Sequence, residues 1–145
     1  MKKILIVVIC FLFLSGCGMS EKKLDLNNLE SKLSSSEYFL NHEIISSDVV
    51  ANRYSIDTSK FEELMMLSST KYDDATMFFI AYPNNTNTKK EFETFIESYN
   101  SQWVGMNYFP EQKKLVENGL YADYNNYLVY IVSQDNNKVL NMIKE

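Results

Sequence analysis

Apolar residues recur at intervals of three and four along one stretch of the chain, which is the spacing of a single face of an α-helix. The residues of this stripe are Phe92, Phe95, Ile96, Tyr99, Trp103 and Met106. Thr88 and Glu91 precede it with the spacing of a capping box, in which both side chains bond free amide groups of the first turn. Gly105 and Pro110 follow it. The pattern predicts a long helix from Thr88 to about Gly105.

Shorter stretches carry similar signals and predict four further helices. These cover residues 25–33, 47–54, 110–116 and 135–143, with Asp25 capping the first and Asp135 or Asn136 capping the last. Pro110 suits the first position of its helix, where the missing N–H has no helical partner. The pair Asn118-Gly119 predicts a left-handed turn that ends the same helix.

Four other stretches have the composition of strands. They are Phe61–Ser68, Ala75–Tyr82, Leu120–Tyr124 and Tyr127–Ser133. Ala75–Tyr82 is apolar on both faces, as a central strand covered at least partly on each side would be. Asn125-Asn126 tolerates positive φ and predicts a tight hairpin turn. The sequence therefore predicts an α+β fold: a four-stranded, mainly antiparallel sheet with helices packed on one face, in which two strand-strand-helix units follow N-terminal helices.

The first residues of the chain have the pattern of a bacterial lipoprotein leader. Lys2-Lys3 precedes the apolar run Ile4–Leu14, which is shorter than the roughly 20 residues of a membrane-spanning helix. The residues that follow, Leu14, Ser15, Gly16 and Cys17, match the lipobox, in which small residues let the signal peptidase reach the bond before the cysteine. We therefore expect cleavage before Cys17.

The two cysteines support this interpretation. Cys10 is lost with the leader, so Cys17 would be the only thiol of the mature protein and could form no internal disulfide. A diacylglycerol group on Cys17 would hold the protein on the extracytoplasmic face of the cell membrane. No other cofactor and no metal is predicted. The expected organisation is a signal peptide at residues 1–16, a lipidated cysteine with a short tether at 17–24, and one extracytoplasmic domain at 25–145.

The charge balance excludes some partners. The full chain has a formal net charge of −5, and loss of Lys2 and Lys3 with the leader makes the mature part more acidic still. An acidic domain is repelled by nucleic-acid phosphates and by anionic lipid headgroups. We therefore expect no nucleic-acid partner, and contact with the membrane through the lipid anchor.

Several segments, taken in order, resemble one lipoprotein family. They are Arg53–Asp57, Asp74–Ile80, Tyr108–Gln112, Asn125–Val129 and Val132–Asp135. Their order and spacing resemble the uncharacterised Gram-positive lipoprotein family known as domain of unknown function 4358. The chain departs from the family pattern at Ser55, where glycine is usual, and at Thr76, where glutamate is typical. The resemblance implies a lipoprotein of unassigned activity and brings no catalytic residues with it.

No catalytic motif stands out in the sequence. His42 is the only histidine, and it lies in a polar stretch without a recognisable nucleophile motif, so we interpret it as a surface residue. Carboxylates are plentiful, at Glu62, Glu63, Asp73, Asp74, Glu91, Glu93 and Glu97. A glycoside hydrolase needs two of them facing each other, one with a raised pKa. We interpret them as solvated, and keep an envelope-glycan hydrolase as an alternative.

Tyrosines are concentrated on the predicted hairpin, at Tyr121, Tyr124, Tyr127 and Tyr130. They could form an open binding surface for a peptide or glycan, or they could pack across the strands, which we favour. The best-supported function is a non-catalytic, membrane-anchored binding domain whose partner is another envelope protein or a wall polymer. A small solute-binding lipoprotein is a further alternative.

Overall fold

A five-stranded antiparallel sheet forms the centre of the molecule in the computed structural model, which describes residues 23–106 and 108–145. The strands are β1 (His42–Ile44), β2 (Phe61–Ser69), β3 (Met77–Pro83), β4 (Leu120–Tyr124) and β5 (Tyr127–Val132). Their spatial order is β1-β2-β3-β5-β4, and every neighbouring pair is antiparallel. The predicted α+β class with an antiparallel sheet is therefore confirmed, with five strands where four were predicted.

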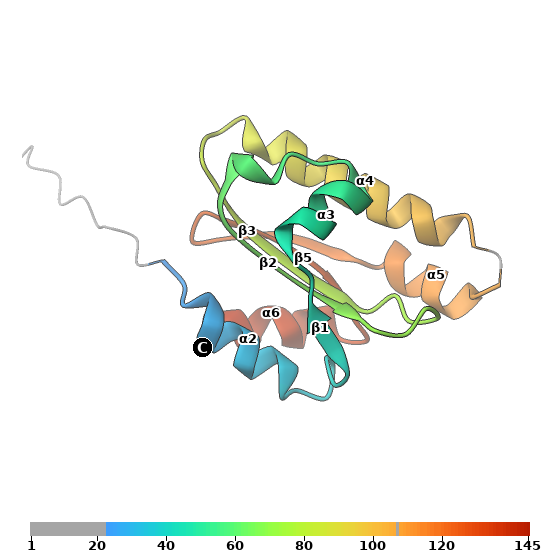
Figure 1. Ribbon diagram of the computed structural model, residues 1–145. Helices are drawn as coiled ribbons and strands as arrows, with labels where there is room; N and C mark the ends of the chain where they lie inside the picture. Colours follow the sequence, from blue (N-terminus) through green and yellow to red (C-terminus); the bar gives the residue numbers. More distant parts are fainter. Residues whose placement is uncertain (1–22, 107) are drawn as a thin grey trace, which may run out of the picture.

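Helices cover both faces of this sheet (Figure 1). They are α2 (Leu26–Ser34), α3 (Ser47–Tyr54), α4 (Thr88–Val104), α5 (Pro110–Glu117) and α6 (Asn136–Lys144), with a short 3-10 turn, η1 (Thr58–Lys60), before β2. Helices α2 and α6 lie on one face, and α3, α4 and α5 lie on the other. The prediction that the helices pack on one face is wrong.

The central strands show why two helical layers are needed. Residues 77–81 of β3 are all buried, and successive side chains of a strand point to opposite faces. Phe79 packs with Phe92 and Phe95 of α4 on one face. Phe78 faces the other way, into a second apolar cluster that includes Leu33 of α2. Exposing either face would leave large apolar side chains in water, so each face needs its own cover.

No hydrophobic pattern predicts β1. Its three residues pair only with Leu67–Ser69 at one end of β2. Beyond it, the Ile45 amide donates to the Met66 carbonyl oxygen at 2.9 Å before α3 begins. Three residues are too few for an alternating pattern to be recognised.

The predicted helix caps at Asp25 and Asp135 and the predicted hairpin turn at Asn125-Asn126 are confirmed. The Asp25 carboxylate accepts hydrogen bonds from two amides of the first turn of α2, and that of Asp135 accepts one from the first turn of α6. Asn125 and Asn126 have φ of 47° and 63°, as the hairpin between β4 and β5 requires.

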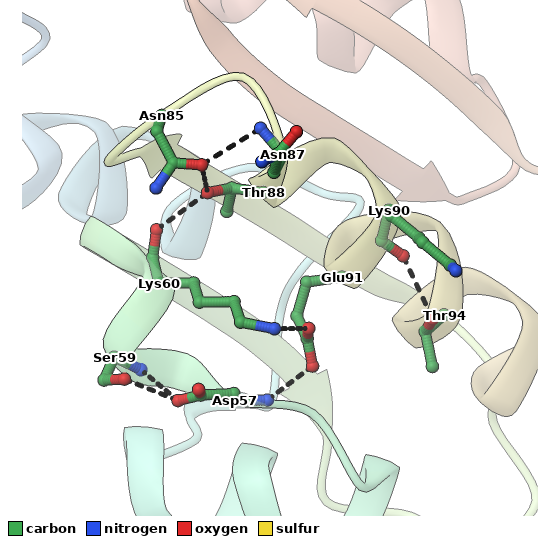
Figure 2. A network of polar contacts seen from close by, with 9 residues as sticks. All are labelled: Asp57, Ser59, Lys60, Asn85, Asn87, Thr88, Lys90, Glu91 and Thr94. Atoms are coloured by element: carbon green, nitrogen blue, oxygen red, sulfur yellow. Dashed lines mark hydrogen bonds and ion pairs between the residues drawn. The ribbon is translucent and has the colours of Figure 1, made fainter.

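The capping box predicted for α4 is wrong, because both of its side chains bond elsewhere (Figure 2). Helix α4 follows Asn87, and the hydroxyl of the buried Thr88 lies 3.2 Å from the carbonyl oxygen of Lys60. The Glu91 carboxylate accepts from the Asp57 amide and from the Lys60 ammonium, each at 2.6 Å. These contacts tie the start of α4 to η1, so a tertiary contact replaces a local one.

The left-handed turn predicted at Asn118-Gly119 is also wrong. Asn118 has φ of −94°, and no described glycine has positive φ. Gly119 is required for space instead, since a Cβ there would lie at 2.8 Å from Cζ of Tyr130. A glycine is needed at the end of α5, but the reason is close packing against the Tyr130 ring and not a left-handed backbone.

The leader and the lipidation site lie outside the described residues. This applies to the signal peptide at 1–16, to Leu14, Ser15, Gly16 and Cys17, and to most of the tether. None of the helices among the described residues has the length and hydrophobicity that spanning a bilayer requires.

Candidate functional site

A cleft of about 440 Å³ is lined in part by residues at the end of α4. In Figure 1 this end of α4 lies on the side of the molecule away from the start of α2. Four parts of the fold line the cleft: β1 with the residue after it, α3, the end of β2 with the connection to β3, and the last two turns of α4 with Met106. We call it the distal cleft and define it by Arg53, Tyr54, Tyr72, Tyr99, Trp103 and Met106.

The floor of the distal cleft is fixed by two buried tyrosines. The Tyr99 hydroxyl donates to the carbonyl oxygen of Ala75 at 2.7 Å, which ties α4 to the start of β3. The Tyr54 ring packs edge-on against Phe95, with centroids 4.8 Å apart. Burial raises the pKa of Tyr54 and raises that of Tyr99 well above its usual value, so both remain neutral phenols. The floor is therefore uncharged and fixed to β3 and α4 by these contacts.

The rim, in contrast, exposes large apolar and aromatic groups. The Tyr72 side chain is 84% exposed and Tyr108 is 90% exposed, although tyrosines are usually half-buried or more. The Tyr72 ring contacts Phe109, the neighbour of Tyr108 in the chain, at 6.1 Å between centroids, and Met106, which also lines the cleft, is exposed. These rings gain nothing from core packing, and contiguous exposed apolar groups of this kind mark interaction sites.

Arg53, the only arginine of the chain, adds a positive charge to this rim. Its exposed side chain belongs to the last turn of α3. Glu43 and Asp74 also line the cleft, so its polar edge carries both signs of charge. Tyrosine, tryptophan and arginine together are the residue types that contribute most binding energy at protein interfaces.

A second, more polar pocket of about 650 Å³ lies on the other side of the β2–β3 connection. Lys71 and Asp74 line both it and the distal cleft. His42 lies in this pocket, half-buried, with its Nε2 atom 3.1 Å from the carbonyl oxygen of Thr76. Burial would raise the pKa of Asp74, but hydrogen bonds from Thr76 and Ser69 hold the pKa of this carboxyl below its usual value.

The carboxylates give no support to the hydrolase alternative. A general acid needs a carboxyl group whose pKa is raised. Within the described residues, the carboxyl groups with a displaced pKa are Asp57, Asp74 and Glu91, and in all three the pKa is lowered. Among residues 23–106 and 108–145, no three or more histidine, cysteine, aspartate or glutamate side chains are arranged to hold a metal ion.

The four hairpin tyrosines do not form one surface. Tyr121 pairs with Tyr130, and Tyr124 pairs with Tyr127, on opposite faces of the sheet. Tyr127 and Tyr130 are buried, and their hydroxyls donate to Glu63 and Asn100 at 2.8 and 2.7 Å. Tyr121 and Tyr124 are half-buried against the two cores. These rings therefore pack within the fold and leave no single tyrosine surface on the hairpin.

Sequence reasoning missed the rim residues. Tyr72 lies in a polar turn and Tyr108 two residues before a proline, where no periodic pattern draws attention to them. The one feature that distinguishes them in the sequence is that each is an aromatic residue outside the predicted helices and strands.

Comparisons with known proteins add no information about this site. No protein-family model, curated protein or solved structure matches the chain. The resemblance to the lipoprotein family therefore stays a prediction, and the chemistry of the site is argued from the residues of this chain alone.

Proposed function

We propose that this chain is a lipid-anchored binding protein on the extracytoplasmic face of a bacterial membrane, and that the distal cleft receives its partner. The lipobox Leu14–Cys17 and the apolar run before it support the anchor. The partner is another envelope protein or a wall polymer. The family resemblance of the sequence supports the same assignment.

One observation carries the proposal. Tyr72, which lines the cleft, and Tyr108, which precedes the Phe109 ring that Tyr72 contacts, expose nearly all of their side chains, and the floor of the cleft is uncharged and held by a hydrogen bond to β3. A partner would bury these rings at little cost, because a tyrosine side chain has few torsions to immobilise. The end of α4, which contributes Trp103 to the cleft, also lies away from the start of α2 in Figure 1, and hence away from the predicted membrane surface, where a partner in the envelope can reach it.

Site-specific crosslinking in living cells tests this directly. A photo-reactive residue at position 72 should give a discrete crosslinked product, and Arg53→Ala should reduce its yield. The matched control is position 137, which is exposed on α6 on the opposite face of the sheet. Products of the same size and yield from both positions, or none from position 72, would contradict the proposal.

A small-solute receptor is a second candidate, favoured by the size of the cleft. Sites for small molecules have volumes of roughly 300–1,000 Å³, and the distal cleft falls in this range at about 440 Å³. Trp103, the only tryptophan, lines it and provides a natural fluorescent reporter. Saturable changes in emission with single amino acids or sugars, but not with wall fragments, would favour this candidate. Trp103→Phe is the control for signal from other sources.

A further inference from the structure

The edge of β2 is only half covered by β1. Strand β1 pairs with Leu67–Ser69, whereas β2 extends back to Phe61. Among the described residues, no strand pairs with residues 61–65 on the side away from β3. Such an edge presents unpaired backbone donors and acceptors to any strand that approaches it.

The register identifies which groups are available. Backbone groups alternate between the two sides of an antiparallel strand. The Met66 carbonyl oxygen points to the β1 side, where it accepts from the Ile45 amide at 2.9 Å. Leu64 lies two residues away, so its N–H and C=O point to the same, unpaired side.

This stretch of edge lies at the bottom of a groove of about 670 Å³ between α2 on one side and the start of α3 with η1 on the other. We call it the edge groove. Its apolar lining includes Leu26, Ile44 and Leu64, and its carboxylates are Glu30, Glu62 and Glu63. None of the described residues that line it is a lysine, an arginine or a histidine. The groove is thus apolar at its base and uniformly negative in charge.

The molecule itself shows that these carboxylates accept a lysine. The Lys23 ammonium lies 2.5 Å from Oε2 of Glu62 and 3.5 Å from Oε1 of Glu63. Lys23 is not among the residues that line the groove, so its ammonium reaches the two glutamates without occupying the groove itself. Glu30 has no cation among its contacts within the described residues, so the groove keeps an uncompensated charge.

We propose that the edge groove binds an extended, lysine-bearing segment of a partner protein, which adds to β2 as a strand beyond the end of β1. Main-chain bonds to Leu64 would provide affinity, and alternate side chains of the segment would meet the apolar base and the carboxylates. A second copy of this chain fits poorly, because edge-to-edge pairing would bring two sets of glutamates together. This inference does not rest on the proposed function, since Ile45 is the one described residue that lines both the groove and the distal cleft, and neither Leu64 nor the three glutamates line the cleft.

The test uses the full chain in detergent solution and three blocked peptides of eight residues. One alternates valine and lysine, one alternates valine and glutamate, and one repeats the lysine peptide with the backbone amides of a single edge N-methylated. The lysine peptide should bind and shift the NMR amide signals of Leu64 and Ile44. Methylation on the pairing edge should weaken binding by about tenfold or more, since it removes main-chain hydrogen bonds. Methylation of the opposite edge should have little effect.

Protein variants give an independent readout. Glu30→Gln and Glu62→Gln should each weaken the lysine peptide by about two- to fivefold, the range for exposed ion pairs. Glu93→Gln, an exposed change on α4, is the matched control. Leu64→Pro should abolish binding, because proline removes the donor yet is tolerated on edge strands. If that variant does not fold, the methylated peptides still decide the question.

Several results would overturn the proposal. Equal binding of the glutamate and lysine peptides would remove the charge argument, and indifference to methylation would remove the strand. Amide shifts confined to the distal cleft would place the peptide elsewhere. Peptide binding that appears only when residues 17–22 are deleted would identify these residues as the occupant, and dimers that dissociate on addition of the lysine peptide would identify a second copy.

Discussion

Gly119 shows at the scale of a single residue how closely the helical layer packs on the sheet. A Cβ at this position would contact Cζ of Tyr130 at 2.8 Å. The ring cannot move aside cheaply, because it is buried and its hydroxyl donates to Oδ1 of Asn100. We expect Gly119→Ala to lower the free energy of unfolding by about 1–3 kcal/mol, the usual cost of overpacking. Urea denaturation followed by circular dichroism measures it.

Gly105 provides the matched control for that substitution. It has φ of −73°, and its added Cβ would meet nothing closer than the Ser101 carbonyl oxygen at 3.5 Å. Gly105→Ala should therefore change stability by less than about 0.5 kcal/mol. Equal losses for the two variants would show that Tyr130 is not the cause.

Glu91 makes stability depend on pH. The hydrogen bond from Lys60 and that from the Asp57 amide hold the pKa of Glu91 below its ordinary value of 4.5. A lowered pKa in the folded state adds stability above the unfolded pKa, and this contribution is lost as the pH falls through the folded value. Glu91→Gln should therefore cost about 1 kcal/mol at pH 7 and progressively less below about pH 4.5. The measurement is urea denaturation across this range.

The exposed Glu93 on the same helix provides the comparison, because Glu93→Gln makes the same charge change without a described hydrogen bond or ion pair to lose. A difference between the two variants that does not shrink in acid would rule out the proton linkage. The contact itself was beyond sequence reasoning, since Thr88 and Glu91 have the local spacing of a capping box. In the fold, the Lys60 carbonyl oxygen bonds Thr88 and the Asp57 amide bonds Glu91, from positions more than 25 residues away in the sequence.

At the scale of elements, α2 is an integral part of the fold, although it is the first described helix. Leu33 is fully buried in the cluster that joins α2 and α6 to the sheet. The Lys32 ammonium also donates to the carbonyl oxygen of Met142 in α6 at 2.7 Å. We expect Leu33→Ala to cost about 2–5 kcal/mol, as is usual for a buried leucine. Leu40→Ala, at a side chain 57% exposed, should cost far less in the same thermal or urea unfolding experiment. Similar losses would mean that α2 is not docked as described.

The elements were predicted better than their arrangement. All five helices and four of the strands follow from spacing, caps and turn residues, because those signals are local. β1 is too short to produce a pattern, and its pairing depends on Leu67–Ser69 in another strand. The strand Ala75–Tyr82 did indicate cover on both faces. Cover on both faces requires helices on both, which is why the prediction of helices on one face is wrong.

The candidate site was beyond the reach of sequence patterns for the same reason. Arg53, Tyr72 and Trp103 come from α3, a turn and α4, and only the packing of these parts brings them together. The hairpin tyrosines attracted attention because they are neighbours in sequence, yet pairing across β4 and β5 places them on two faces. Successive side chains of a strand point to opposite faces of the sheet. Several tyrosines close together in the sequence of a hairpin therefore need not lie on one surface.

At the scale of the whole molecule, the two proposed binding surfaces lie at different distances from the predicted membrane. Lys23 contacts Glu62 of the edge groove, whereas the distal cleft is lined by residues at the end of α4, which lies away from the start of α2 in Figure 1. A tether of a few residues spans only about 20 Å even when fully extended. The groove would therefore meet partners close to the bilayer, and the distal cleft would meet partners farther out in the envelope.

This layout depends on lipidation of Cys17, and the two cysteines allow a matched test. Two acyl chains contribute roughly 0.8 kcal/mol per buried methylene, so a diacylglycerol anchor is stable where the acidic domain alone would be repelled. We expect Cys17→Ala to move the protein from the membrane fraction to the medium, or to leave an uncleaved precursor. Cys10→Ala, within the apolar run of the leader, should leave fractionation and mature mass unchanged. Mass spectrometry of the mature N-terminus checks both. Membrane retention of a cleaved Cys17→Ala protein would mean that something other than a lipid holds it, and the assignment of near and far surfaces would lose its basis.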